Sequence, residues 1–228
     1  MRLDKYLADM QIGTRSQVKK LIQKGFVQVN DEIIKKIDFK VNEDDIVVVD
    51  GMRVDYVSYE YYLLNKPAGF ICATQDNRYP SVLELIPYVR KDIAIVGRLD
   101  VDTQGALLIT NDGQLNHKLL SLKHHVDKKY YVEVDSVLPE NAKEIFSQPM
   151  EFSDFTSQPA LYEDIDDTSC FITIQEGKYH QVKRMFEQIG CTVTFLNRVQ
   201  FGNLTIDGLE VGEYRELTEE EIQQLYEY

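Results

Sequence analysis

The sequence has few cysteines, no long hydrophobic run and no secretory signal. Its three cysteines, Cys72, Cys170 and Cys191, are scattered and form no Cys-x-x-Cys pair, which indicates reduced thiols rather than a disulfide framework. The first ten residues, MRLDKYLADM, are charged and lack the apolar core of a signal peptide, and runs such as YYLL are far too short to span a bilayer. These absences predict a soluble, cytoplasmic protein without a membrane partner.

The chain also lacks the usual motifs for metals and cofactors. His124 and His125 are adjacent, so they would point to opposite faces of a strand, and neither His117 nor His180 has a second ligand at a useful spacing. The sequence contains no Gly-x-Gly-x-x-Gly or Walker-type loop, and no Ser-His-Asp or Cys-His arrangement stands out. We therefore expect a protein with no metal site and no cofactor.

The charge is unevenly distributed along the 228 residues, which are enough for two small domains with real cores. Residues 1–40 hold nine lysines and arginines and five acidic residues, a net charge of +4, whereas the remaining 188 residues carry −17. A pI of about 4.8 alone argues against a nucleic-acid partner. A basic head on an acidic body, however, indicates a dedicated RNA or DNA contact.

The first 50 residues predict a small module of two helices and a short-stranded sheet. Apolar residues recur at helical spacing over 2–10 and again over 14–24, where Gly25 is the expected stop, and the alternating FVQVN is the first strand. The second helix carries four basic residues that can share one exposed side: Arg15, Lys19, Lys20 and Lys24. From charge alone, a phosphate-binding surface and an ordinary solvated helix face are equally good interpretations.

The rest of the chain predicts a second, larger domain. Residues 51–60 have no clear period and are expected to be a linker, and residues 61–228 are rich in short strands interleaved with helices near 114–121, 139–147, 179–189 and 219–227. Many strands with few helices, on a mostly antiparallel plan, favour an α+β fold with a mixed sheet over a doubly wound one.

Four segments of this second domain could carry chemistry: LNKPAGF (64–70), GRLDVDTQG (97–105), DKKYYVEV (127–134) and EGKYHQVKRMF (176–186). Taken singly, each has a structural interpretation, since its lysines could be solvated and its tyrosines half-buried in a strand. The second segment is the least ordinary, because it places an arginine and two aspartates between two apolar strands.

Taken together, the segments resemble known families over nearly the whole chain. RLDKYL, TRSQVKKLIQKGFVQVN and DDIVVVD resemble the S-four-type RNA-binding domain, and the four later segments resemble, in order, the pseudouridine synthases that modify ribosomal RNA. EGKYHQVKRMF is most similar to the branch that acts on one uridine of small-subunit (16S) rRNA. The resemblance implies a monomeric isomerase acting on ribosomal RNA, either free or in an assembling small subunit, without a cofactor.

The resemblance also assigns roles to residues. It implies that Asp100 is the catalytic aspartate and that Asp102 belongs to the turn, that Tyr130 stacks on the uracil near carbon 5, and that Lys183 keeps Asp100 ionised. Arg98 would fill the gap left by the flipped base or hold a phosphate. The residues expected to contact RNA are Arg2, Lys5, Arg15, Lys19, Lys20, Lys24, Lys66, Arg98 and Arg184.

Other functions remain open at this point. The target could be 23S rRNA, or the chain could be a non-catalytic RNA-binding or ribosome-assembly protein, although such a protein has no use for a carboxylate between two buried strands. A hydrolase or glycosidase acting on RNA or a nucleoside would normally need two carboxylates, and the shared motifs show no second acid.

Overall fold

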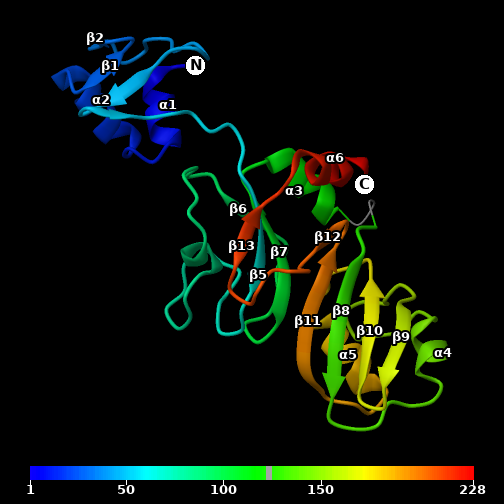
Figure 1. The fold of residues 1–228 in the computed structure, drawn as a ribbon. Coiled ribbons are helices and arrows are strands. Elements are labelled where there is room, and N and C mark those ends of the chain that lie inside the picture. Colours follow the sequence, from blue (N-terminus) through cyan, green and yellow to red (C-terminus); the bar gives the residue numbers. More distant parts are fainter. Residues whose placement is uncertain (122–124) are drawn as a thin grey trace. The chain divides into compact units, whose positions relative to one another are not determined.

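The computed structural model describes residues 1–121 and 125–228 and divides the chain into two compact units (Figure 1). Unit 1 comprises Met1–Glu60 and Pro87–Ile93, and unit 2 comprises Tyr61–Ile86 and Ala94–Tyr228. Residues 51–60, expected to be a linker, lie within unit 1.

Unit 1 contains the two helices and the small sheet that the sequence predicts. Its elements are α1 (Leu3–Asp9), α2 (Arg15–Lys24), β1 (Val27–Val29), β2 (Glu32–Ile33), β3 (Val47–Val49) and β4 (Met52–Arg53), and the strands pair in the order β2-β1-β3-β4. Helix α2 begins with a capping box of Thr14 and Gln17 and ends at Gly25, whose φ of 81° is left-handed. The predicted stop at Gly25 is therefore confirmed.

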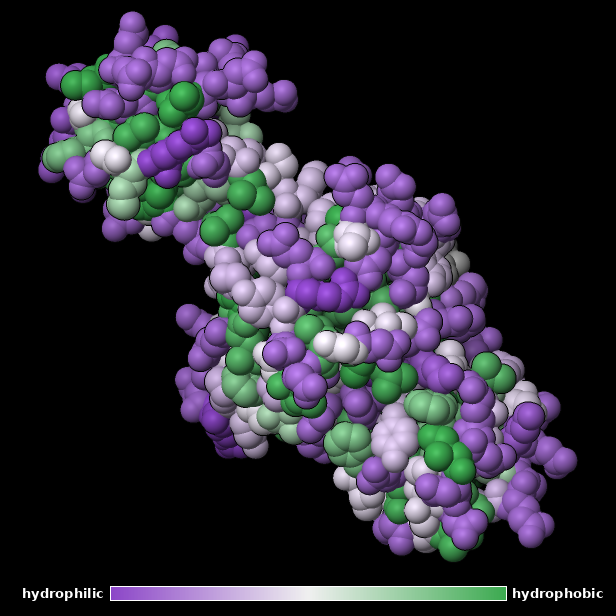
Figure 2. Space-filling view, viewed as in Figure 1, coloured by the Kyte–Doolittle hydropathy of each residue, from purple (hydrophilic) through white to green (hydrophobic). Residues whose placement is uncertain are grey.

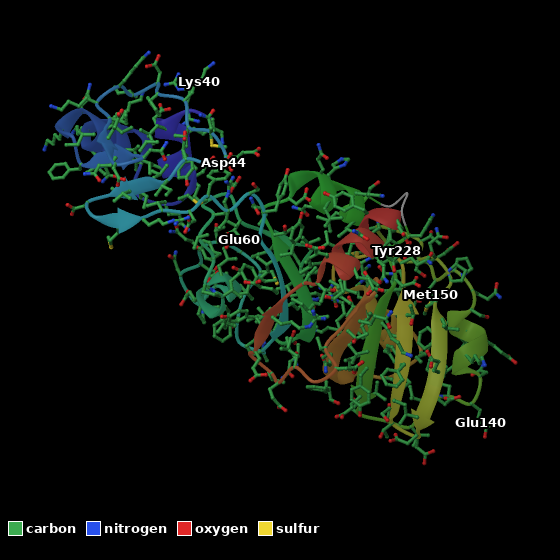
Figure 3. The ribbon with its side chains drawn as sticks, turned by 45° about the horizontal axis from the view of Figure 1, so that its top comes forward. Lys40, Asp44, Glu60, Glu140, Met150 and Tyr228 are labelled. Atoms are coloured by element: carbon green, nitrogen blue, oxygen red, sulfur yellow. The ribbon has the colours of Figure 1, made fainter. Side chains whose placement is uncertain are left out.

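A second segment of the chain completes unit 1. The carboxylate of Glu60, labelled in Figure 3, accepts hydrogen bonds from the backbone N–H groups of Val89 (3.0 Å) and Arg90 (2.7 Å). The Arg90 side chain is buried and donates to the hydroxyl of Tyr56 at 2.5 Å. A buried guanidinium needs such partners, so Pro87–Ile93 is fastened to unit 1 by polar contacts.

Unit 2 holds the remaining elements. They are β5 (Tyr61–Lys66), the 3₁₀ helix η1 (Val82–Leu85), β6 (Ala94–Val96), β7 (Gln104–Thr110), α3 (Gly113–Leu120), β8 (Lys128–Val134), α4 (Ala142–Phe146), β9 (Leu161–Asp166), β10 (Ser169–Ile174), α5 (Gln181–Gln188), β11 (Val193–Phe201), β12 (Leu204–Thr205), β13 (Tyr214–Glu216) and α6 (Glu219–Glu227). In the two described ranges, no helix is both long and apolar enough to cross a membrane.

The strands of unit 2 form one sheet in the order β13-β5-β7-β11-β8-β10-β9, with β6 on β7 and β12 on β11. Among the described residues, β7 and β11 are the parallel pair and the other pairings are antiparallel. The predicted α+β fold with a mostly antiparallel, mixed sheet is confirmed. Strands β9 and β13 were not expected from the sequence.

Two hydrophobic cores lie on the two halves of this sheet. One joins β8 and β10 to α4 and α5 through residues such as Val132, Phe146 and Phe186. The other joins β5 and β7 to α3 and α6 through residues such as Leu108 and Leu115. Figure 1 shows α5 beside β11, β8 and β10, and α3 beside α6. The β7–β11 pair lies between the two cores, and we call this pair the seam of the sheet.

Gly105 sits at this seam because no other residue fits. Its φ is +110°, and a Cβ there would lie 2.2 Å from the carbonyl oxygen and 2.6 Å from the nitrogen of Arg198 in β11. Both atoms belong to the backbone, so they cannot move aside without opening the β7–β11 pair.

We expect Gly105→Ala to destabilise the protein severely, by at least about 4 kcal/mol, because it combines a backbone clash with a strained φ. Chemical denaturation followed by circular dichroism measures the loss. Gly113→Ala is the matched control, since nothing lies within 4 Å of a Cβ at this first position of α3, and it should change stability by less than about 1 kcal/mol. Equal midpoints for the two variants would contradict the role of Gly105.

Candidate active site

Asp100 lies on the loop between β6 and β7, just before the seam. The loop is anchored on both sides of Asp100: the Leu99 side chain is buried in the core, and the Gly69 N–H donates to the carbonyl oxygen of Val101 at 2.7 Å. The Thr103 N–H donates back to the carbonyl oxygen of Asp100 at 3.1 Å. These bonds close a tight turn that presents the half-buried Asp100 side chain to a pocket.

Lys66, expected to contact RNA, is instead fully buried beneath this loop. Its ammonium donates to the carbonyl oxygens of Thr103 (2.7 Å), Pro67 (3.0 Å) and Asp100 (3.0 Å). Burial lowers the pKa of Lys66, and the charges of Cys72, Asp102 and Asp100 oppose this shift only in part. The lysine at the end of β5 therefore points into the protein, where it supplies the donor that these carbonyl groups need, and it is not exposed on the surface where RNA contact was expected.

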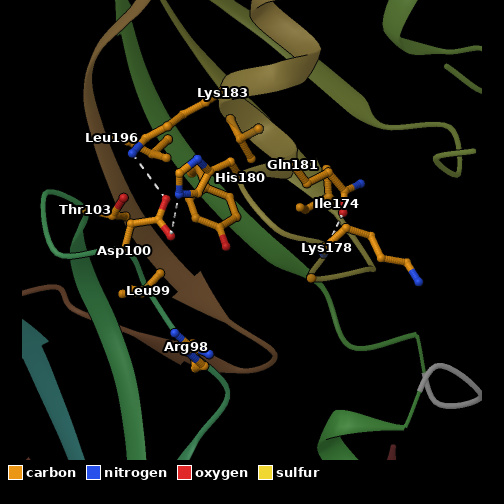
Figure 4. A pocket seen from close by; sticks show the side chains of 13 residues that line it. Arg98, Leu99, Asp100, Thr103, Ile174, Lys178, His180, Gln181, Lys183 and Leu196 are labelled. Carbon is orange, nitrogen blue, oxygen red and sulfur yellow. Dashed lines mark hydrogen bonds and ion pairs between the residues drawn. The ribbon is translucent and has the colours of Figure 1, made fainter. Parts of the chain in front are cut away.

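Lys183 reaches Asp100 from helix α5. It is the third residue of the helix, and long helical side chains point back toward the N-terminus. Its ammonium lies 3.2 Å from the Asp100 carboxylate and 2.7 Å from that of Asp102 (Figure 4 shows the ion pair with Asp100). The expected partner of Asp100 thus contacts both aspartates, and Asp102 is more than a turn residue.

The electrostatics around Lys183 favour an ionised Asp102. Burial raises the pKa of Asp102, but the hydrogen bond and charge of Lys183 outweigh it, so the pKa of Asp102 falls below its ordinary value. In turn, burial lowers the pKa of Lys183, but its bonds to Asp102 and Asp100 outweigh that effect and raise it. The ammonium therefore stays charged at neutral pH and stabilises negative charge on the loop.

His180 is a second neighbour of Asp100 that the sequence did not indicate. Its Nε2 lies 3.5 Å from the Asp100 carboxylate, as Figure 4 shows. The residue has left-handed backbone angles (φ 50°, ψ 30°) just before α5, and its ring stacks on Tyr179 with centroids 3.8 Å apart. The motif EGKYHQVKRMF carries His180, but nothing in its letters tells which side chain turns inward.

The third predicted catalytic residue, Tyr130, lines the same pocket as Asp100 and Lys183. Tyr130 is 7% exposed and lies opposite Arg198 across the β8–β11 pair. Since alternate residues of a strand share a face, Lys128 and Tyr130 point into the protein while Lys129 points outward. Segments far apart in the sequence thus place a carboxylate, an ammonium and an aromatic ring around one small pocket of about 70 Å³.

The two arginines of unit 2 that are expected to contact RNA, Arg98 and Arg184, differ in whether a carboxylate already pairs with them. Arg98 is exposed and lines the pocket beside Asp100. Arg184 forms an ion pair with Asp154 (2.5 Å) and lies over the rings of Phe152 and Phe155. Because a carboxylate already neutralises Arg184, it is a weaker candidate for a phosphate contact than Arg98.

The basic residues of unit 1 also fall into two groups. Arg2 pairs with Asp4, and Lys5 pairs with Asp9. The four of helix α2 are exposed, and in the described part of the chain none of them forms an ion pair: Arg15, Lys19, Lys20 and Lys24. The face of unit 1 drawn in Figure 2 is largely hydrophilic.

No group of three His, Cys, Asp or Glu side chains that could hold a metal ion is found in residues 1–121 and 125–228. His124, considered above as a ligand, lies outside the described residues. Asp100, Lys183, His180 and Tyr130 all line the same pocket.

Comparison with known proteins matches both units to families. The family described as RNA pseudouridylate synthase matches residues 60–188, and the S4 domain matches residues 1–47. A ribosomal small subunit pseudouridine synthase A of Haemophilus influenzae is 37% identical over 99% of both chains, and that of Escherichia coli is 39% identical over 97% of this chain and 98% of its own. An uncharacterized RNA pseudouridine synthase of Bacillus subtilis is 41% identical over 100% of this chain and 99% of its own.

One solved structure, described as a pseudouridylate synthase, has a TM-score of 0.70 and 36% identity over 99% of both chains. It agrees with the sequence comparisons over the whole length.

We expect Lys183→Met to raise the pKa of Asp102, because burial would then be opposed only by a backbone hydrogen bond and the charge of His180. Carboxyl-carbon NMR titration of the full chain measures the shift. Lys183→Arg keeps the charge and should leave the titration near that of the wild type. An Asp102 titration that is the same in all three proteins would contradict the arrangement.

Proposed function

The chain belongs to the RNA pseudouridylate synthase family and is an RNA-modifying isomerase with an S4 domain, and we propose that it converts one uridine of 16S ribosomal RNA to pseudouridine. The observation that carries this proposal is the Asp100–Lys183 ion pair in a pocket lined by Tyr130. The rRNA target is supported by the printed names of the Haemophilus influenzae and Escherichia coli relatives.

The reaction breaks the bond between N1 of uracil and C1′ of the sugar, turns the base, and joins C1′ to C5. The C5 proton leaves and N1 gains one, so the product is an isomer of the substrate. We propose that the Asp100 carboxylate assists the first step, either as a nucleophile toward C1′ or as a base toward the 2′ hydrogen. The Lys183 ammonium lies 3.2 Å from this carboxylate and is proposed as its partner.

The base must leave its stack to reach Asp100. In our proposal Tyr130 stacks on the uracil near C5, and the exposed Arg98 occupies the gap in the RNA or holds a phosphate. Asp102, whose carboxylate accepts from Lys183, positions the ammonium rather than reacting. His180, 3.5 Å from Asp100, limits the side-chain rotation of the catalytic carboxylate.

We further propose that residues 1–50 are an RNA-binding domain, residues 51–60 a connection, and residues 61–228 the catalytic domain of a monomeric cytoplasmic enzyme. The RNA is free rRNA or an assembling small subunit. Unit 1 supplies the exposed cations of α2, whereas residues 41–228 carry a net charge of −17. Long-range attraction to phosphate must therefore come largely from the head.

Pseudouridine mapping of rRNA from cells with and without the protein tests the function. We expect one position of 16S rRNA to lose its modification and to regain it when the wild-type gene is restored. A lost position in 23S rRNA would support the alternative target. Unchanged modification of all rRNA would contradict the proposed activity and favour a non-catalytic role in ribosome assembly.

Asp100→Asn should abolish the modification, by several orders of magnitude in single-turnover rate, because it removes the charge without changing the shape. Asp102→Asn should retain most activity, since its amide oxygen can still accept from Lys183. Both purified variants are assayed on the same RNA. An inactive Asp102→Asn together with an active Asp100→Asn would show that Asp102, not Asp100, is the catalytic carboxylate.

Changing Arg15, Lys19 and Lys20 together to Gln should weaken RNA binding and flatten its salt dependence. The log–log slope should fall by roughly one unit for each phosphate that the variant no longer binds. The rate on saturating RNA should stay near that of the wild type. Binding across a salt series and single-turnover assays measure the two effects.

The matched control removes the same charge from unit 1 outside helix α2, by changing the exposed Lys36, Lys40 and Arg53 to Gln. An equal fall in affinity in both triple variants would mean that net charge, not the α2 face, attracts the RNA.

A further inference from the structure

A second cavity of about 400 Å³ lies next to the Asp100 pocket and contains two buried cations, Lys128 and Arg198, that take no part in the reaction proposed for Asp100. The two share Arg98, Tyr130, Gly177 and Lys178 as lining residues, so they adjoin each other. The second cavity is lined by four cationic side chains, which we call the basic pocket: Arg98, Lys128, Lys178 and Arg198.

Arg198 is the buried floor of the basic pocket. It is 2% exposed, its Nε donates to the carbonyl oxygen of Ala106 at 2.8 Å, and its guanidinium lies over the ring of Phe201. Its Nη2 is buried and has no hydrogen-bond partner in the described part of the chain, where Arg198 also forms no ion pair. A buried guanidinium without a carboxylate is costly, so its free donor is expected to meet an anion.

Lys128 adds a second buried cation. Its ammonium donates to the carbonyl oxygens of Val126 (2.8 Å) and Gln175 (3.0 Å), which leaves one of its three hydrogens for another acceptor. Burial and the nearby Arg198 charge lower the pKa of Lys128 to about 8, while Asp127 and Glu176 oppose this shift. Lys128 is therefore still mostly charged at neutral pH.

Glu176 also lines the cavity, but it does not neutralise the basic pocket. Its two carboxylate oxygens accept from the Gln158 N–H (3.0 Å) and from the Gln181 side chain (2.6 Å). In the described part of the chain it forms no ion pair with Lys128 or Arg198. Four cations against one carboxylate leave a positive cavity in the acidic part of the chain.

We propose that the basic pocket binds a backbone phosphate of the RNA strand next to the uridine that reacts at Asp100; this rests on the proposed function. Phosphate fits because it is the anion that recurs along RNA, and guanidinium and ammonium groups are its usual ligands. Arg198 and Lys128 hold it from below, and the exposed Arg98 and Lys178 hold it from the rim. The phosphate fixes the sugar relative to the Asp100 carboxylate, so Arg198 and Lys128 are positioning residues.

The test is a double-mutant cycle that combines one substitution in the protein with one modification of the RNA. A 16S fragment containing the mapped uridine is made with a single neutral methylphosphonate at each phosphate around that uridine, and its dissociation constant is measured for the full-length protein. Lys128→Gln is the main variant and Arg198→Lys the second, each checked for folding by circular dichroism. Lys129→Gln is the matched control, since the neighbouring lysine faces outward and pairs with Glu163.

We expect Lys128→Gln to weaken binding of unmodified RNA about tenfold, and one methylphosphonate to weaken wild-type binding by a similar factor. In Lys128→Gln that same methylphosphonate should have almost no further effect, because the two changes remove one interaction. Lys129→Gln should bind like the wild type and remain fully sensitive to the methylphosphonate. The single-turnover rate should fall in Lys128→Gln, even at saturating RNA, if the phosphate positions the sugar.

Additive effects at every phosphate, in both Lys128→Gln and Arg198→Lys, would overturn the phosphate site, and so would equally weakened binding in Lys129→Gln. If the wild type still isomerises the uridine in that case, the proposed function stands and only the basic pocket is wrong. A wild type that forms no pseudouridine in any rRNA overturns the proposed function instead.

Discussion

The buried ammonium of Lys66 is the constraint on which the rest of the site depends. A single side chain from the end of β5 binds carbonyl groups on both sides of the Asp100–Thr103 turn. Without this donor, the Thr103 carbonyl would lose its bond to Lys66, and the Asp100 carbonyl would keep only its bond from the Thr103 N–H. Because Lys66 binds the Asp100 carbonyl as well as that of Thr103, it fixes the backbone from which the Asp100 carboxylate extends.

The pairing of strands in the sheet places the other residues of the site next to the Asp100–Thr103 turn. The close backbone approach at Gly105 allows β7 to pair in parallel with β11. Strand β11 in turn pairs with β8 and contacts α5. Tyr130 and Lys183, which are 53 residues apart in the sequence, therefore meet at the same pocket as Asp100. The same seam buries Arg198 below the adjoining cavity, so catalysis and phosphate binding would share one scaffold.

The sequence predicted the parts of this arrangement that have a local signal. Gly25 marks the end of helix α2 through its left-handed backbone conformation, which depends on the residue itself and its neighbours. Strand β9 escaped prediction because five of its six residues are exposed or polar, and its pairing with β10 comes from the tertiary fold. Lys66, Lys128 and Arg198 look like ordinary solvated cations in the sequence, since burial of a charged residue depends on carbonyl groups and rings distant along the chain. The Asp100–Lys183 pair was expected only through family resemblance, as no rule of spacing links residues so far apart.

The most direct test of this account is the rate at which Lys66→Met isomerises RNA that is already bound. Single-turnover rate and dissociation constant are measured on the same 16S fragment, with folding checked by circular dichroism. Since Lys66 is fully buried and does not face RNA, the account predicts unchanged affinity and a rate lowered by at least about a hundredfold, the scale of effect expected when a catalytic group is misplaced by about 1 Å. A folded Lys66→Met protein that turns over bound RNA at the wild-type rate would contradict it.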